Sequence, residues 1–151
     1  MRPVMLFGFT PLLLLTLPCG AADEGLVPSQ HQLREACSMS GSQADLNACL
    51  HEKLGDSQHA VERAESALFA AFERWDEDAE QVRTGQGHAR VARQSFIEYR
   101  ERQCALAASV GGGAIGHTLE ARRLACTAEL NYQRAQQLEA LARELPARPS
   151  S

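Results

Sequence analysis

Apolar side chains recur at steps of three, four and seven residues through the first half of the chain. They are Leu46, Leu50, Leu54, Val61, Ala64, Leu68, Phe72 and Trp75. This spacing places them on one stripe of an α-helix and does not fit the period of two of a half-buried strand. Ser42 and Asp45 are typical of a helix N-terminus. We therefore predict a first helix from Ser42 to about Glu80, with a kink or break at Gly55 and Asp56.

Two more helices are predicted after a turn at residues 84–87, which contain two glycines. The second runs from about His88 to Ala108, and the third from about Thr118 to Leu145, where prolines follow. The predicted inward side chains are Val91, Ser95 or Phe96, Tyr99 and Leu106 in the second helix, and Leu119, Leu124, Leu130, Leu138 and Leu141 in the third. No segment alternates convincingly with a period of two. The fold class is therefore predicted to be all-α, an antiparallel three-helix bundle.

The N-terminal residues are typical of a secretory signal peptide. Arg2 precedes an apolar run, and small residues at 20–22 provide a cleavage site. The run is shorter than the roughly 20 residues of a membrane-spanning helix, but an uncleaved anchor remains an alternative. Lipid attachment at Cys19 is a further alternative, which we disfavour because Pro18 stands where a small residue is required.

A length of 151 residues predicts one domain. The expected organisation is a signal peptide at 1–22, an irregular segment at 23–41 with a short turn near His31 to Ala36, a helical domain at 42–145 and a disordered tail at 146–151.

Four cysteines remain after signal removal: Cys37, Cys49, Cys104 and Cys126. An even number in a small exported domain indicates disulfides, for which four cysteines allow three connectivities. Cys104 and Cys126 are equally distant from Ile115, the centre of the predicted hairpin between the last two helices. Mirror positions of a hairpin lie side by side, so we favour Cys104–Cys126, with Cys37–Cys49 as the second pair. Free thiols and a metal site are the alternatives; zinc-type spacing is absent, and we expect no metal.

The charge balance is weakly acidic, with 15 Lys and Arg against 19 Asp and Glu. Nucleic-acid binding needs clustered cations, so we expect that this protein does not bind nucleic acid. Five acidic residues close the first predicted helix: Glu73, Asp76, Glu77, Asp78 and Glu80. Anions oppose the dipole at a helix C-terminus. The run is either a solvated helix end or a surface that attracts a basic partner.

Three segments, taken in their order along the sequence, resemble the LprI-like family, which is named after a lysozyme inhibitor. They are Cys37 with residues 42–49 (SQADLNAC); residues 92–104 (ARQSFIEYRERQC); and Gly112 and Gly113 with residues 126–130 (CTAEL). The resemblance implies an exported, disulfide-stapled helical domain. For at least one member it also implies inhibition of lysozyme.

Arg100 and the glycines Gly112 and Gly113 are further candidates for partner binding, beside the acidic residues. Arg100 has a structural alternative, an ion pair with a carboxylate of another helix. The glycines belong to a flexible hairpin tip that could enter a partner's cleft; they lack the Lys-Ser/Thr ending of a phosphate loop. The aromatic residues at 69, 72 and 75 are expected in the core, with an exposed binding strip as the alternative.

No catalytic motif is apparent: the chain has neither a nucleophile elbow nor a His-Glu-x-x-His pattern. We therefore expect a non-enzymatic protein without cofactors, located in the periplasm or secreted, with no membrane span after signal cleavage. The leading hypothesis is a binding protein that occludes a basic hydrolase such as a lysozyme. The alternatives are an envelope adaptor with another partner and, less favoured, a small envelope hydrolase.

Overall fold

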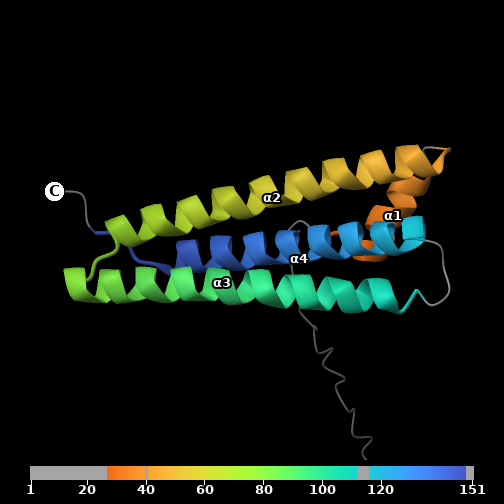
Figure 1. Cartoon of the computed structure of the whole chain (residues 1–151). Helices are drawn as coiled ribbons and strands as arrows, with labels where there is room; N and C mark the ends of the chain where they lie inside the picture. The colour runs from red at the N-terminus through yellow and green to blue at the C-terminus, as the bar shows by residue number, and fades with distance from the viewer. Residues whose placement is uncertain (1–26, 40, 112–115, 149–151) are drawn as a thin grey trace, which may run out of the picture.

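The structure, a computed structural model, describes residues 27–39, 41–111 and 116–148. It contains four helices: α1 (Gln30–Ser38), α2 (Gln43–Arg74), α3 (Ala79–Ser109) and α4 (Gly116–Glu144). Successive long helices run antiparallel, so α2 and α4 run in the same direction; α4 lies between α2 and α3, and α1 packs at one end of the bundle (Figure 1). The all-α prediction is confirmed, with a short fourth helix added to the three expected.

The segment expected to be irregular contains α1. Its N-terminus is a capping box: Ser29 Oγ accepts a hydrogen bond from Gln32 N at 3.2 Å, and Gln32 Oε1 accepts one from Ser29 N at 2.8 Å. The helix buries Leu33 and Cys37 against α2 and α4. This packing and the two cap bonds hold a nine-residue helix that would be marginal alone.

The boundary between the first two long helices was predicted wrongly. Helix α2 runs unbroken through Gly55 and ends at Arg74, and α3 begins at Ala79, so the predicted turn at 84–87 lies inside a helix. Asp78 is the N-cap of α3, and its Oδ1 accepts hydrogen bonds from Glu80 N at 2.8 Å and Gln81 N at 2.9 Å. Gly85 serves close packing instead of a turn, because a Cβ there would lie 2.6 Å from Phe72 Cε1.

The core is divided into two clusters along the bundle. One joins α1, α2 and α4 around Leu50 and Leu124, and the other joins α2 and α4 around Leu68, Phe72 and Leu138. Helix α4 contributes mainly small buried residues: Ala121, Ala125, Ala128 and Ala135. Short side chains let two helix axes approach closely, and α4 makes its most extensive contact with α2.

The predicted inward face of α3 is wrong. Val91 is 66% exposed, Tyr99 55% and Leu106 57%, whereas Cys104 is the only residue of α3 that is fully buried. In the third predicted helix, Leu124 and Leu138 are buried as expected, but Leu141 is 48% exposed. Helix α3 packs mainly on α4 and touches α2 little, so only a narrow stripe of α3 needs to be apolar.

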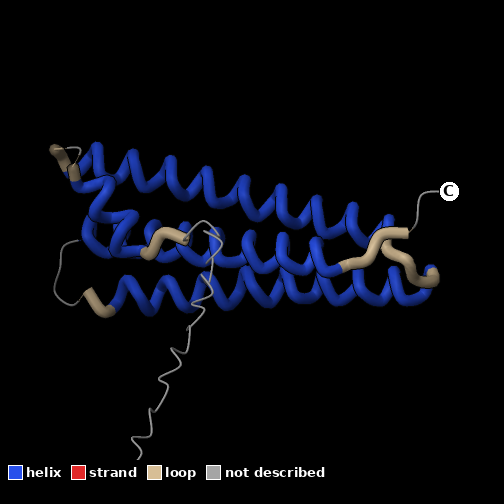
Figure 2. The backbone as a smooth tube through the Cα atoms, turned by 180° about the vertical axis from the view of Figure 1, so that it is seen from behind, coloured by secondary structure: helices blue, strands red, loops and turns tan. Residues whose placement is uncertain are grey.

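The segment after α4 is described as far as Arg148. We call residues 146–148 the C-terminal strap, because they lie across the turn between α2 and α3 (Figure 2). Asp76 N donates to Pro146 O at 3.0 Å, Arg148 N donates to Arg74 O at 2.9 Å, and Arg148 Nε donates to Trp75 O at 3.0 Å. The expected disordered tail is therefore wrong for residues 146–148, while residues 149–151 lie outside the described part.

Candidate functional site

Both favoured disulfides are present in the structure. Cys37–Cys49 joins α1 to α2 with a Cα–Cα distance of 5.6 Å, and Cys104–Cys126 joins α3 to α4 at 5.5 Å. Helices α1 and α3 pack less extensively than α2 and α4 pack on each other. Each of these two helices is thus bonded covalently to α2 or to α4. A framework of this kind fixes the relative positions of the exposed side chains.

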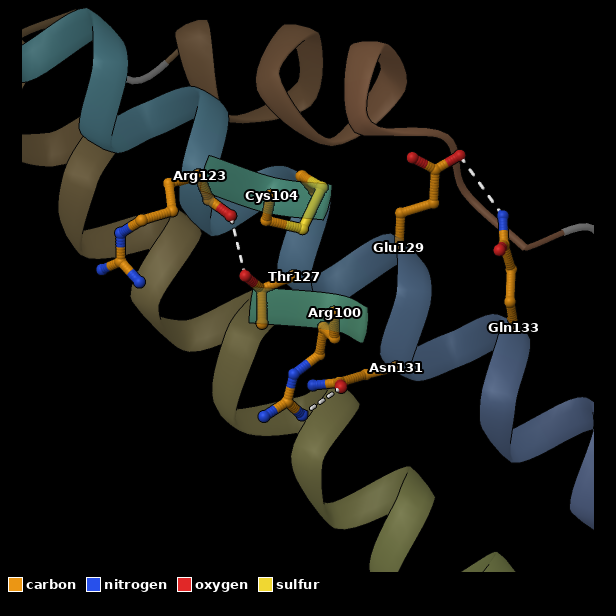
Figure 3. Close-up of a disulfide and its surroundings, with 8 residues drawn as sticks. Arg100, Cys104, Arg123, Thr127, Glu129, Asn131 and Gln133 are labelled. Atoms are coloured by element: carbon orange, nitrogen blue, oxygen red, sulfur yellow. Dashed lines mark hydrogen bonds between the residues drawn. A yellow bond between two sulfur atoms is a disulfide. The ribbon is translucent and has the colours of Figure 1, made fainter. Parts of the chain in front are cut away.

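A polar link joins all three long helices beside the second disulfide, and Figure 3 shows its part between α3 and α4, the hydrogen bond from Arg100 to Asn131. Arg100 Nη1 of α3 donates to Asn131 Oδ1 of α4 at 2.8 Å, and Asn131 Nδ2 donates to Ser57 Oγ of α2 at 3.0 Å. Ser57 Oγ in turn donates to the carbonyl of Leu54 at 2.7 Å. Asn131 and Ser57 are completely buried. Arg100 therefore acts inside the bundle, and its partner is an amide instead of the expected carboxylate.

The sequence contains little evidence for this hydrogen-bonded link. Asn131 interrupts an otherwise apolar stripe of α4, and its spacing from Ala128 and Ala135 places all three on one helix face. That position was the available signal, since a polar residue on a buried face requires a hydrogen-bond partner. Its partners lie 31 and 74 residues away, which no local pattern reveals.

The acidic run forms an exposed turn between α2 and α3. We call Glu73, Asp76, Glu77, Asp78 and Glu80 the acidic turn; all five are exposed. Asp78 and Glu80 lie at the N-terminus of α3, where anions are favoured by the helix dipole, so most of the expected conflict with the dipole does not arise. None of the ion pairs formed among the described residues uses a carboxylate of the acidic turn. These charges are therefore available to an external cation.

Several of the residues singled out in the sequence have no described position. Gly112, Gly113, Cys19 and the whole of residues 1–22 lie outside the described part of the chain. Phe72 is buried as expected, while its neighbours Phe69 and Trp75 are half-buried and contact its ring edge-on, with centroids 6.4 and 5.9 Å away. The aromatic residues therefore belong to the core and its edge.

Three groups with shifted pKa values, Glu120, Arg123 and Tyr132, lie on α4, away from the acidic turn. Arg123 donates hydrogen bonds of 2.9 and 2.6 Å to the two carboxylate oxygens of Glu120. These bonds lower the pKa of Glu120 and raise the pKa of Arg123. Burial, followed by the charge of Asp56, raises the pKa of Tyr132. The Glu120–Arg123 pair ties together the first turns of α4 and favours the helix locally.

Within residues 27–39, 41–111 and 116–148, no three His, Cys, Asp or Glu side chains are grouped so as to hold a metal ion. His51 and His59 are exposed on α2. No helix in the same residues has the length and apolar character needed to cross a membrane.

Four helices linked by two disulfides, with an exposed acidic turn at one end, define a small, disulfide-stapled all-α protein. A family model described as the lysozyme inhibitor LprI matches residues 34–138, and the chain belongs to this family. Neither the curated proteins nor the solved structures contain a match.

Proposed function

We propose that this protein is exported and inhibits a basic hydrolase of the lysozyme type by binding to its surface, without catalysis of its own. The observation that carries the proposal is the family match over residues 34–138, which spans α2 and α3 and most of α1 and α4. The two disulfides support an oxidising compartment such as the periplasm or the cell exterior.

The acidic turn is the proposed first contact. Its five exposed acidic side chains lie on one short stretch of chain, and they form no ion pair with cations of the described residues. A local excess of negative charge accelerates association with a basic protein, and salt weakens the effect. Gly112 and Gly113 remain proposed contacts of their own, separate from the acidic turn, because the turn precedes the 31-residue helix α3 and the glycines follow it in the chain.

The experiment measures lysozyme activity and association rates in the presence of the purified mature chain. We expect inhibition of at least one lysozyme type, and no effect of micromolar protein on any type tested would overturn the proposal. The variant Asp76→Asn with Glu77→Gln should slow association by about threefold to tenfold at low salt. Asp78 is left unchanged because it caps α3.

The matched control removes the same charge elsewhere. Glu52 and Glu101 are exposed on α2 and α3, outside the acidic turn, and neither forms an ion pair within the described residues. Glu52→Gln with Glu101→Gln should leave the association rate nearly unchanged. An equal loss in both double variants would show that net charge matters and that the acidic turn has no specific role.

A further inference from the structure

Two cavities meet between the long helices at the end of the bundle that carries the acidic turn. The larger has a volume of about 480 Å³; we call it the apolar cavity, because its lining includes Phe72, Trp75, Leu141 and Leu145. The smaller, of about 250 Å³, is the arginine cavity, lined by Arg90, Arg93, Glu65 and Phe69 among others. Both are lined by Leu68, Ala89, Arg134 and Leu138, so they adjoin one another.

The apolar cavity exists because α3 presents small residues to it. Gly85, Ala89 and Ala92 line it from α3, opposite larger side chains of α2 and α4. Its volume falls within the range of about 300–1,000 Å³ that is typical of pockets for small molecules, and its mainly apolar lining with few polar groups is also typical.

Arg134 carries an unsatisfied donor where the two cavities meet. Its Nε is buried and has no hydrogen-bond partner in the part of the chain that the structure describes. The guanidinium carbon lies 5.6 Å from the centroid of the Phe96 ring, which orients the group but accepts no conventional hydrogen bond. A buried donor without an acceptor is unfavourable. Because this Nε is closed to solvent, a carboxylate or phosphate oxygen would form its charge-assisted bonds with the terminal amino groups of the half-buried Arg134 side chain.

The charges around Arg134 favour an anion on the side of the arginine cavity. Three arginines line this cavity against the single carboxylate of Glu65, which is paired with Arg93 at 3.2 Å. Arg90 lies over the ring of Phe69, 5.3 Å from its centroid. The apolar cavity instead has a carboxylate, Glu144, in its lining beside Leu145 and Pro146. The site is therefore positive at Arg134 and mainly apolar beyond it, where His88 and Glu144 are the polar residues of the lining.

We propose that this site binds a single-chain amphiphile with an anionic head group. The head group contacts Arg134, and the hydrocarbon chain occupies the apolar cavity towards Trp75. This binding does not depend on inhibition of a hydrolase, and either property can fail while the other stands.

Trp75 provides the measurement, since it is the only tryptophan of the protein and lines the apolar cavity. The purified mature chain is titrated with hexadecanoate below its micellar concentration while tryptophan fluorescence is recorded. We expect a saturable change with hexadecanoate and at least tenfold weaker binding of hexadecyltrimethylammonium. A parallel titration uses hexadecyl phosphate. The anion that binds more tightly shows whether the site prefers a phosphate or a carboxylate head group. Equal or tighter binding of the cation than of both anions would overturn the proposal.

Two variants locate the ligand. Arg134→Gln should weaken hexadecanoate binding by about tenfold to a hundredfold, as expected for loss of a charge-assisted hydrogen bond. Arg102→Gln, which removes an exposed cation of α3 outside both cavities, is the matched control and should bind as the natural chain does. Ala89→Phe should fill the junction of the cavities and abolish binding in a protein whose helical circular dichroism is retained. If Ala89→Phe does not fold, the arginine pair decides the question: equal affinities of Arg134→Gln and Arg102→Gln would refute the site.

Discussion

One amide side chain holds three helices together. Asn131 accepts from Arg100 of α3 and donates to Ser57 of α2, and it does so with no exposure to solvent. Hydrogen bonds in such a chain strengthen one another, and removal of the central member takes an acceptor from Arg100 and a donor from Ser57, which keeps only its bond to the Leu54 carbonyl. Asn131 is therefore the residue at which a small change has the widest effect on the bundle.

We predict that Asn131→Ala lowers the free energy of unfolding by about 1–3 kcal/mol, because the buried groups of Arg100 and Ser57 lose their partner. Urea denaturation followed by circular dichroism measures the loss. The matched control is Asn47→Ala in α2, since the buried Oδ1 of Asn47 has no hydrogen-bond partner among the described residues. This control should change stability by less than about 0.5 kcal/mol. Equal losses in both variants would show that the polar link is not important for stability.

At the scale of single residues, the sequence is informative where large side chains decide the packing. The stripe that includes Leu50, Leu68 and Phe72 was predicted from spacing alone, and these residues are buried. The buried alanines of α4 escaped prediction, because alanine is common on exposed helix faces as well. For Arg100 the structural alternative was an ion pair with a carboxylate, whereas its partner is the amide of Asn131, which is distant in sequence and leaves no periodic signature.

Helix α3 shows why element boundaries were harder to predict than element types. Two glycines at positions 85 and 87 usually indicate a turn, yet both lie inside a 31-residue helix. The cap at Asp78 sets the beginning of the helix. Gly85 is required by the approach of the Phe72 ring, whereas Gly87 has nothing within 4 Å of a Cβ built upon it.

The two glycines of α3 should therefore respond in opposite ways to alanine. Gly87→Ala should stabilise the protein by about 0.5–1 kcal/mol, since glycine costs backbone entropy inside a helix. Gly85→Ala should destabilise it by about 1–2 kcal/mol, because its Cβ would displace the Phe72 ring. Thermal unfolding of both variants gives the comparison. A gain at both positions would mean that the ring moves aside at little cost.

For the whole molecule, the disulfides compensate for unequal packing. Helices α2 and α4 form the best-packed pair, whereas α1 is short and α3 rests mainly on α4. Each of these less securely packed helices carries one half of a disulfide. The pairing was predictable because mirror positions of a helical hairpin must face each other. The C-terminal strap was not predictable, because it is held largely through main-chain carbonyl and amide groups, which have no side-chain pattern.

Removal of the Cys104–Cys126 bond should cost about 3 kcal/mol through the lost loop constraint. In the double variant Cys104→Ser and Cys126→Ser, amide hydrogen exchange should accelerate most in α3, because its remaining contacts are few. Cys37→Ser with Cys49→Ser is the matched control and should accelerate exchange mainly in α1. Uniform acceleration over all helices in either variant would contradict this division of the molecule.

The C-terminal strap has a practical consequence for handling the protein. Arg148 donates hydrogen bonds to the carbonyls of Trp75 and Glu73, so this residue lies directly beside the acidic turn. An affinity tag or sensor-chip linkage attached beyond this point would crowd those carboxylates and mask them from a soluble analyte. Immobilisation through a surface position near α1, at the opposite end of the bundle, keeps that face accessible (Figure 1).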